Sequence, residues 1–368
     1  MTMNPRQGPG TRARIGSMSM CFLVVVGLVG CSTDDARPAG EAGDSGGPAA
    51  TVTVRLLAHD SWAASDGIFD PLLEQGIDVE VITGGDAGSL ANSIVLDREN
   101  PQADVVYGVD NTFVGRALEN DAFAVREYDL TNVVPELLAE VDTERIVPID
   151  YGDVCVNFDE AWFAEREISP PTSIDDLIDS TYSGLTVVQD ANLSSPGLAF
   201  LLATTERNPT GWEQWWSAFV SNDALVVPDW TTAWAEFSAG GDDGARPIVV
   251  SYASSPPVDV LYSDPPRDTT RIGVVDDGCF RQIEYAGVLR NARHDDAAAD
   301  VVQFLLSERF QTDIPLNMFV WPSNRLVPEP DLFARFALHP SDPIVLTSAA
   351  IEERRDRVLE AWTDIVLS

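Results

Sequence analysis

The sequence predicts an α/β fold with two lobes, and three features of its 368 residues support this prediction. Short β-rich runs alternate with longer amphipathic stretches from residue 51 onward, which favours a sheet flanked by helices. About 318 residues follow that point, which is too many for one typical hydrophobic core. Several runs end in loops of Asp, Ser and Gly, as in α/β folds that bind ligands beyond the carboxyl ends of strands.

The first half of this region shows strand and helix patterns in turn. Strands are expected at 52–57, 77–82 and 103–107, where β-branched residues are frequent. Helices are expected at 66–75 and 89–96, where apolar residues recur at helical spacing. Because strands and helices interleave, the sheet should be largely parallel.

A second α/β set follows, with strands expected at 185–188 and 247–250 and helices at 197–206 and 210–220. Two further helices, at 297–306 and 348–365, close the chain. No internal repeat is evident, and no segment after residue 51 is long and apolar enough to cross a bilayer.

The first fifty residues are predicted to be a leader and a linker. A basic stretch at 11–14 and an apolar run at 21–30 precede Cys31, in the order of a lipoprotein signal peptide that ends in a lipobox. Residues 1–30 would then be removed, and Cys31 would carry the lipid. The alternative is that Cys31 merely lies near a short apolar run. Residues 31–50 are rich in Gly, Pro, Ala and acid, which predicts a disordered linker.

The formal net charge is −36, from 59 acidic and 23 basic residues, and none of the basic residues is a lysine. The sequence therefore excludes a phosphate-loop lysine and a Schiff-base lysine. An acidic chain is also unsuited to nucleic acid, whose phosphates need a basic surface. The acidity favours cationic ligands at long range, or serves solubility alone.

No catalytic or metal-binding set is apparent. Cys155, Cys279 and three scattered histidines lack ligand spacing, so no metal is expected. The triplet at 59–61 holds His, Asp and Ser, but neighbours in an extended chain point to opposite faces and cannot form a triad. We therefore expect a binding protein with no cofactor, not an enzyme. Outside the cell Cys155 and Cys279 could form one disulfide; two buried unpaired cysteines are the alternative.

Aromatic residues lie near the ends of predicted strands. Trp62 and Trp230 each follow an acid within two positions, and Tyr252 directly follows a buried-looking strand. An aromatic cage with a nearby acid suits a flat cation. Trp230 and Trp234 also have the i, i+4 spacing of a helix packed in a core, and spacing alone favours that interpretation. The loop at 84–88 is rich in glycine and could offer backbone N–H groups to a ligand.

Six segments occur in the order found in a known family. They are the segments at 60–62, 85–90, 103–111, 148–152, 189–198 and 250–256, and the similarity continues from residue 314 to 322. Together they resemble the thiamine-binding periplasmic protein family, the substrate-binding components of thiamine importers.

This resemblance implies a class II periplasmic-binding-protein fold with a ligand cleft between two lobes. The first lobe would comprise residues 51–147 and 281–368, and the second 148–280. It also implies an exported protein, in the periplasm or lipid-anchored at the outer face of the cell membrane, that captures thiamine or its phosphates. Its partners would be the permease and ATPase subunits of an ATP-driven importer.

The resemblance further implies a set of ligand-binding residues. Asp86 would lie near the polar end of the ligand, the Ser194 and Ser195 hydroxyls would hold its side arm, and the aromatic walls would come from Trp230 and Tyr252. The full set is Asp86, Ala87, Ser194, Ser195, Trp230, Tyr252, Ala253, Ser254 and Ser255, with Trp62 or Phe319 as a third wall.

The sequence departs from the family at four of its aromatic positions. His59 and Val258 replace tyrosines, and Asp66 and Phe319 replace tryptophans. Phe319 keeps a ring, so a cation–π contact can persist there.

The resemblance places Cys155 and Cys279 where the chain crosses between lobes, which supports a bridge. Iron(III) or a polyamine is the alternative ligand, although iron binders of this kind usually have adjacent tyrosines and Tyr252 is followed by Ala253. A lipoprotein that senses its ligand for a membrane kinase is the alternative role.

Overall fold

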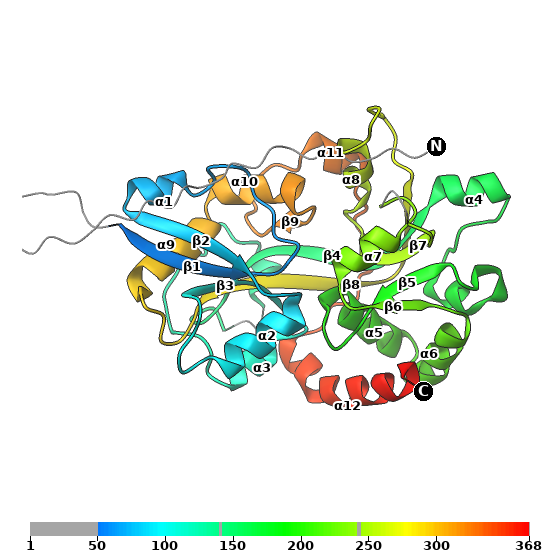
Figure 1. Cartoon of the computed structure of the whole chain (residues 1–368), viewed down its shortest axis with the longest axis horizontal. Coiled ribbons are helices and arrows are strands. Elements are labelled where there is room, and N and C mark those ends of the chain that lie inside the picture. Colours follow the sequence, from blue (N-terminus) through cyan, green and yellow to red (C-terminus); the bar gives the residue numbers. More distant parts are fainter. Residues whose placement is uncertain (1–50, 140–141, 241–243, 368) are drawn as a thin grey trace, which may run out of the picture. The chain divides into compact units, whose positions relative to one another are not determined.

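One mixed β-sheet of nine strands organises the computed structural model, which describes residues 51–139, 142–240 and 244–367. The strand order is β2-β1-β3-β8-β4-β7-β5-β6, and β9 pairs with β4 off this path (Figure 1). The predicted signal peptide at 1–30, Cys31 and the linker at 31–50 lie outside the described residues.

Three parallel strands form one end of the sheet. Strand β1 (Val52–Ala58) pairs with β2 (Ile77–Thr83) and with β3 (Val105–Asp110). Helices α1 (Asp70–Glu74), α2 (Ala87–Leu96) and α3 (Val114–Glu119) alternate with these strands. The sequence predicted this order of elements up to β3, but it did not predict α3.

The predicted helix at 66–75 is reduced to α1, and the sequence explains why. Gly67 has φ +71°, a left-handed conformation that breaks a helix. Pro71 lies in the first turn of α1, where its missing N–H costs nothing. Gly76 follows with φ +85° and ends the segment.

Another parallel group forms the opposite end of the sheet. Strand β5 (Thr186–Gln189) pairs with β6 (Leu225–Val227) and β7 (Ile248–Tyr252). The helices of this region are α4 (Glu160–Arg166), α5 (Ser195–Arg207), α6 (Trp212–Ser221), α7 (Trp230–Glu236) and α8 (Pro256–Leu261). Short 3-10 helices occur at Pro135–Leu138, Ile174–Ile178 and Ser180–Tyr182.

Long antiparallel strands join the two ends. Strand β4 (Val147–Asp159) pairs with β8 (Ile272–Val288) along most of its length, and β8 also pairs antiparallel with β3. The prediction of a largely parallel sheet is therefore wrong at the centre. The local sequence pattern does not mark either strand. Both are largely buried on both faces and carry polar residues among the apolar ones, so they show neither a two-residue period nor an apolar run.

The remaining elements follow β8. They are α9 (Asp295–Leu305), α10 (Glu308–Asn317), β9 (Trp321–Pro322), α11 (Asp331–Phe336) and α12 (Ser348–Val366). Within the described ranges, no helix has both the length and the apolar character needed to span a membrane.

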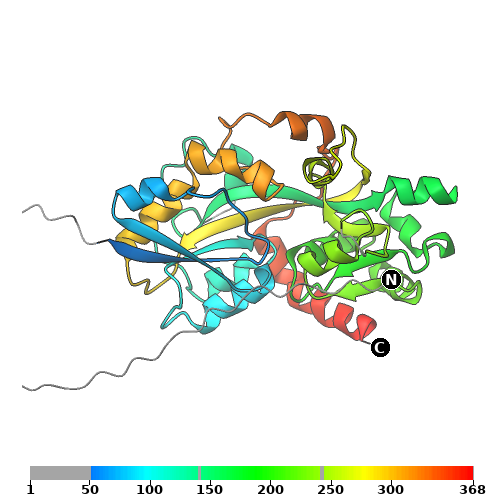
Figure 2. The same ribbon diagram turned by 45° about the horizontal axis from the view of Figure 1, so that its top comes forward.

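Helices cover both faces of the β1–β3 end, as Figures 1 and 2 show. On one face, α1, α9 and α10 bury Val105 and Tyr107 of β3. On the other face, α2, α3 and α12 bury Val106 and Val109. Val105, Val106 and Tyr107 thus alternate between the two cores, as strand geometry requires. The irregularity at Gly108 then turns Val109 to the same side as Val106.

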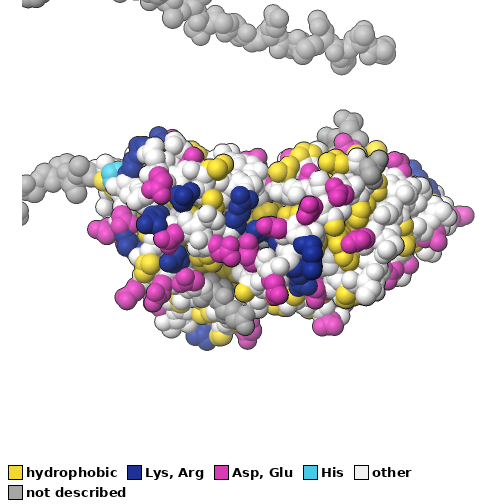
Figure 3. Space-filling view, turned by 90° about the horizontal axis from the view of Figure 1, so that it is seen from below, with side chains coloured by type: hydrophobic (Ala, Val, Ile, Leu, Met, Phe, Trp, Pro, Cys, Tyr) yellow, Lys and Arg dark blue, Asp and Glu magenta, His cyan; other side chains and the backbone are white. Residues whose placement is uncertain are grey.

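Helix α12 contacts both α3 and α6, so it connects elements of the two predicted lobes. Its Trp362 packs edge-to-face on Trp216 of α6, with ring centroids 5.7 Å apart. The lobe boundaries at 147/148 and 280/281 stay a prediction. On the face that Figure 3 presents, arginine side chains lie among acidic ones.

The predicted disulfide between Cys155 and Cys279 is confirmed. It joins β4 to β8 where their register shifts, and it closes a sequence separation of 124 residues. Both half-cystines pack with Ala253, Trp321 and Phe333 in a small buried cluster. The bridge therefore links the two central strands, β4 and β8, between which the chain forms β5, β6 and β7.

Candidate functional site

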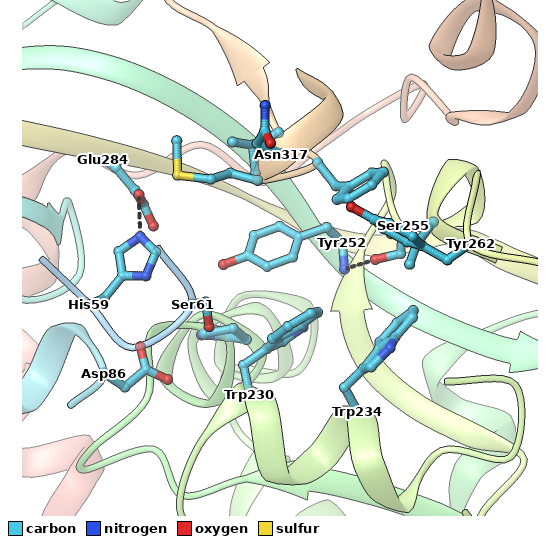
Figure 4. Close-up of a pocket in the computed structure, with 15 residues that line it drawn as sticks. His59, Ser61, Asp86, Trp230, Trp234, Tyr252, Ser255, Tyr262, Glu284 and Asn317 are labelled. Atoms are coloured by element: carbon cyan, nitrogen blue, oxygen red, sulfur yellow. Dashed lines mark hydrogen bonds and ion pairs between the residues drawn. The ribbon is translucent and has the colours of Figure 1, made fainter. Parts of the chain in front are cut away.

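A cavity of about 320 Å³ lies where the loops after β1, β2 and β7 face the middle of β8 (Figure 4). Its volume is at the lower end of the range for small-molecule sites. Its walls come from segments far apart in the sequence: His59, Ser61, Asp86, Pro196, Trp230, Trp234, Tyr252, Ser255, Val258, Tyr262, Glu284, Asn317, Met318, Phe319 and Val320.

One wall is aromatic and is built on α7. Trp230 and Trp234 are one helical turn apart and stack on each other, with ring centroids 5.3 Å apart and planes at 20° (Figure 4). Asp229 begins the helix and accepts a hydrogen bond from the Thr232 N–H. The Trp230 Nε1–H donates to Ser251 Oγ at 2.9 Å. The ring faces are therefore held toward the cavity.

Tyr252 and Phe319 continue this wall. The Tyr252 hydroxyl donates to Gln282 Oε1 at 2.9 Å, and its backbone N–H donates to Ser255 Oγ at 3.2 Å. Phe319 lies edge-on to Tyr262, with ring centroids 6.0 Å apart. Phe319 also has φ +55°, a strained backbone conformation for an aromatic residue. Its carbonyl accepts from Ser254 Oγ at 2.6 Å, which helps to hold that conformation.

The opposite end of the cavity carries charge. His59 Nε2 lies 3.3 Å from Glu284 Oε2 in an ion pair whose side chains are each only 12% exposed. Burial alone lowers the pKa of His59, but the charge of Glu284 and its hydrogen bond outweigh burial and raise the pKa to about 9. His59 is therefore an imidazolium at neutral pH.

Acidic residues form a row across three strands behind this ion pair. Glu284 of β8 is directly opposite Asp110 of β3 and Asp150 of β4. Burial raises the pKa of Asp110 to about 7, and burial and the charge of Glu284 raise the pKa of Asp150 well above its usual value. Like charges on neighbouring strands repel, and this repulsion from Glu284 adds to the effect of burial on the pKa of Asp150. The Asp150 carboxyl is also hydrogen-bonded to the Tyr107 hydroxyl.

Asp86 enters the cavity from the start of α2. As the N-cap residue it accepts a hydrogen bond from the Ala87 N–H at 2.8 Å. Burial raises the pKa of Asp86, although the nearby Ser194 hydroxyl and His59 partly offset this effect. The Gly88 N–H donates to the Leu193 carbonyl at 3.1 Å, so the start of α2 touches the loop before α5.

The structure brings together part of the predicted site. Asp86, Trp230, Tyr252, Ser255 and Phe319 line the cavity. The spacing alone favoured a core position for Trp230. That interpretation is wrong, because Trp230 lines the cavity. Trp234 lines the cavity and also contacts the buried Phe237.

Other predicted residues do not line the cavity. Ala87, Ser194, Ser195, Ala253 and Ser254 are buried behind its surface. Backbone N–H groups of the glycine-rich loop are used within the protein, since Gly85 donates to Asp60 and Gly88 donates to Leu193. These residues support the walls instead of forming them.

Trp62 is a further correction, because its indole lies away from the cavity. It stacks on Phe310 at 5.7 Å and packs edge-on to Tyr107 at 4.9 Å between ring centroids. Asp66, which stands where the family has a tryptophan, lies with it at a shallow surface hollow. Of the two rings predicted as the third wall, Phe319 lines the cavity and Trp62 does not.

Sequence reasoning did not include His59, Glu284 or Trp234 in the site. The sequence marked His59 as a departure from a family tyrosine but not as a site residue, yet His59 and Ser61 of the triplet at 59–61 both line the cavity. Asp60 accepts a hydrogen bond from the Gly85 N–H. Glu284 gave no local signal, because its neighbours in space are on other strands. Among the described residues, no group of His, Cys, Asp and Glu is arranged to hold a metal ion.

The profile of the family described as bacterial extracellular solute-binding protein matches residues 100–335. The chain belongs to this family. Its members are binding proteins, which agrees with the expectation from the sequence.

Individual relatives narrow the comparison. The chain is 25% identical to the thiamine-binding periplasmic protein of Escherichia coli K12 over 321 residues, which cover 85% of this chain and 93% of that one. A solved structure of a periplasmic thiamin binding protein has a TM-score of 0.75 and 24% identity, covering 86% and 96% of the two chains. Iron-bound HitA from Pseudomonas aeruginosa has a TM-score of 0.68 and 21% identity, with coverages of 85% and 99%.

These comparisons confirm the predicted fold class, the two-lobed α/β fold of periplasmic binding proteins. They also confirm the resemblance to the thiamine-binding periplasmic protein family that the ordered segments indicated.

Proposed function

We propose that this solute-binding protein captures thiamine for an ATP-driven importer. One observation carries the proposal: the cavity joins a wall of stacked aromatic rings to an end that bears the carboxyl group of Asp86 beside the His59–Glu284 ion pair. Thiamine has a permanent positive charge on its thiazolium ring and a flat aminopyrimidine beside it. A cleft for such a molecule needs ring faces for stacking and acceptors for the charge.

The roles of the residues follow from their positions. Trp230 and Tyr252 would stack on the ligand rings, with Phe319 closing the third side. Asp86 would accept from the polar end of the ligand, and Ser194 would position the Asp86 carboxyl from behind. Ser255 would hold Tyr252 and Ser251 in place through its hydroxyl.

The relatives support the ligand and the partners. Proteins named for thiamine binding match this chain over most of its length. The permease and ATPase subunits of an importer are then the expected partners, and the outer face of the membrane or the periplasm is the expected location. The two lobes, 51–147 with 281–368 and 148–280, would close on the ligand.

Calorimetric titration of the purified protein with thiamine tests this function. We expect one site per chain with a dissociation constant below the micromolar range. Iron(III) citrate is the second titrant, because an iron uptake protein and iron-bound structures are also similar to this chain. Saturable binding of iron, with no heat from thiamine, would overturn the proposal.

We also propose that Cys31 carries the lipid that anchors the protein. Replacing the thiol that would be acylated, Cys31→Ala, should leave an unprocessed or released form. Membrane fractionation with metabolic fatty-acid labelling measures this. A variant that is still processed and acylated would contradict the anchor.

A further inference from the structure

His59 is held in the cavity wall by a dedicated set of contacts. Its ring lies over Gly108, where a Cβ atom would come within 2.2 Å of His59 Cδ2. Gly108 has φ +92°, so both its missing side chain and its left-handed backbone leave this space. Tyr107 contacts the same ring, with centroids 5.8 Å apart. The imidazole is therefore fixed in one orientation toward Glu284.

The charged groups around His59 come from three elements. Glu284 of β8 is its ion-pair partner, and Asp86 at the start of α2 lies beside it at the same end of the cavity (Figure 4). Asp150 of β4 is directly opposite Glu284 in the sheet. The Asp150 carboxyl accepts a hydrogen bond from the Tyr107 hydroxyl of β3, and burial and the charge of Glu284 raise its pKa. Glu284 also accepts from Gln282 Nε2 at 3.1 Å, and Gln282 holds the Tyr252 hydroxyl.

The ion pair changes the charge that a ligand meets. The imidazolium of His59 neutralises Glu284, which leaves Asp86 as the one unpaired acid among the cavity-lining residues that the structure describes. Those lining residues include no arginine, and the chain has no lysine. Nearby guanidinium groups are already paired, Arg281 with Asp153 and Arg271 with Asp259.

We propose that the His59–Glu284 ion pair determines ligand specificity by setting the cavity to accept a single positive charge and to reject phosphate. This inference rests on the proposed function and narrows it to free thiamine. A phosphorylated thiamine would bring negative charge beside Asp86, where the one cation of the described cavity lining, His59, is already paired with Glu284. A polyamine would bring several positive charges to a site with one unpaired acid.

Removing one partner at a time tests the ion pair, because each change leaves the other charge uncompensated. Wild-type protein, Glu284→Gln and His59→Gln are titrated with thiamine, thiamine monophosphate and spermidine. Wild type should prefer thiamine to the monophosphate by about tenfold or more. Glu284→Gln should reduce that preference by roughly tenfold, since it leaves a net positive wall. His59→Gln should increase the preference and strengthen spermidine binding.

A matched pair elsewhere provides the control. His339 and Glu329 form a similar ion pair, 2.9 Å apart, whose side chains are 63% and 35% exposed and which does not line the cavity. His339→Gln should leave all three affinities unchanged. Melting temperatures are measured for each variant. If Glu284→Gln fails to fold, the proposal is tested by whether His59→Gln increases the preference for thiamine over its monophosphate.

The failures of the two ideas are distinguishable. Wild-type protein that binds none of the three ligands would overturn the proposed function. Wild-type protein that binds thiamine, with variants that weaken all ligands by the same factor, would overturn the specificity role and keep the function. Equal affinity of wild type for thiamine and its monophosphate would also overturn the specificity role.

Discussion

The two ends of the cavity are built in different ways. The aromatic end comes largely from residues close in sequence, since Trp230 and Trp234 share one helix and Tyr252 and Ser255 share one turn. The charged end comes from three separate segments, since His59, Asp86 and Glu284 follow or lie on β1, β2 and β8. Under the proposed function, the first end would supply contact area for the ligand and the second would select its charge.

This difference separates substitutions that should weaken the binding of every ligand from those that should alter the preference among ligands of different charge. An aromatic anchor contributes through stacking and exclusion of water, so its loss should weaken every ligand that has a flat ring. The charged end should instead separate ligands of different charge. The predictions below test that division.

The largest effect is expected for Trp230→Ala. Loss of this stacked ring should weaken thiamine binding by about 2–4 kcal/mol, typical of an aromatic anchor. The melting temperature should change little, because Trp230 is outside the buried clusters. Calorimetry and thermal unfolding measure the two properties, and Tyr252→Ala should behave similarly.

A core tryptophan is the control for this prediction. Trp216 is fully buried and donates to Thr204 Oγ1 at 2.9 Å, so Trp216→Phe should lower the melting temperature and leave affinity nearly unchanged. If Trp230→Ala instead bound thiamine like wild type and unfolded earlier, the ring would belong to the core.

The next largest effect is expected for removal of the disulfide. Cys155→Ser with Cys279→Ser should lower the free energy of unfolding by roughly 2–4 kcal/mol, because the bridge restricts a long loop in the unfolded chain. Denaturant unfolding measures this, and reduced wild type serves as the comparison. Thiamine affinity should fall less than in Trp230→Ala. Labelling that finds both thiols free in unreduced, denatured protein would contradict the bridge.

The pH dependence of the free energy of unfolding should show the titration of His59 at the charged end of the cavity. The pKa of His59 is about 9 in the folded protein and near 6.5 in the unfolded chain, so folding favours its protonated form. This contribution is complete below about pH 6.5 and is lost as pH rises through 9, with a slope of up to ~1.4 kcal/mol per pH unit. His59→Gln should flatten the decline between these pH values. Parallel wild-type and variant curves in urea would show that His59 does not titrate this way.

The smallest effect is expected for Gly88→Ala. A Cβ atom there would come within 2.7 Å of the Leu193 carbonyl oxygen, which would displace the start of α2 and Asp86. Thiamine affinity should fall by about 1 kcal/mol or less. Gly115→Ala is the control, because its Cβ would meet the side chain of Glu352, which does not line the cavity. Equal affinities for the two variants would argue against a role for this close contact.

Much of the fold could be predicted from the sequence because its signals are local. Strands β1, β2, β3, β5 and β7, and helices α2, α5, α6, α9 and α12, were predicted within a few residues. The failures have physical causes: α1 is cut by Gly67, and β4 and β8 carry no local period because both of their faces are buried. Trp230, Tyr252 and Phe319 were predicted for the site through the family resemblance, since spacing alone assigned Trp230 to a core.

The sequence by itself determined the alternation of strands and helices, the strong acidity, the absence of lysine and the two cysteines available for a bridge. These properties depend on residues near one another in the chain or on composition. Only the tertiary structure decided that Glu284 meets His59, because 224 intervening residues fold before the two side chains become neighbours. Charge selection depends on distances across strands and loops, and no local pattern encodes those distances.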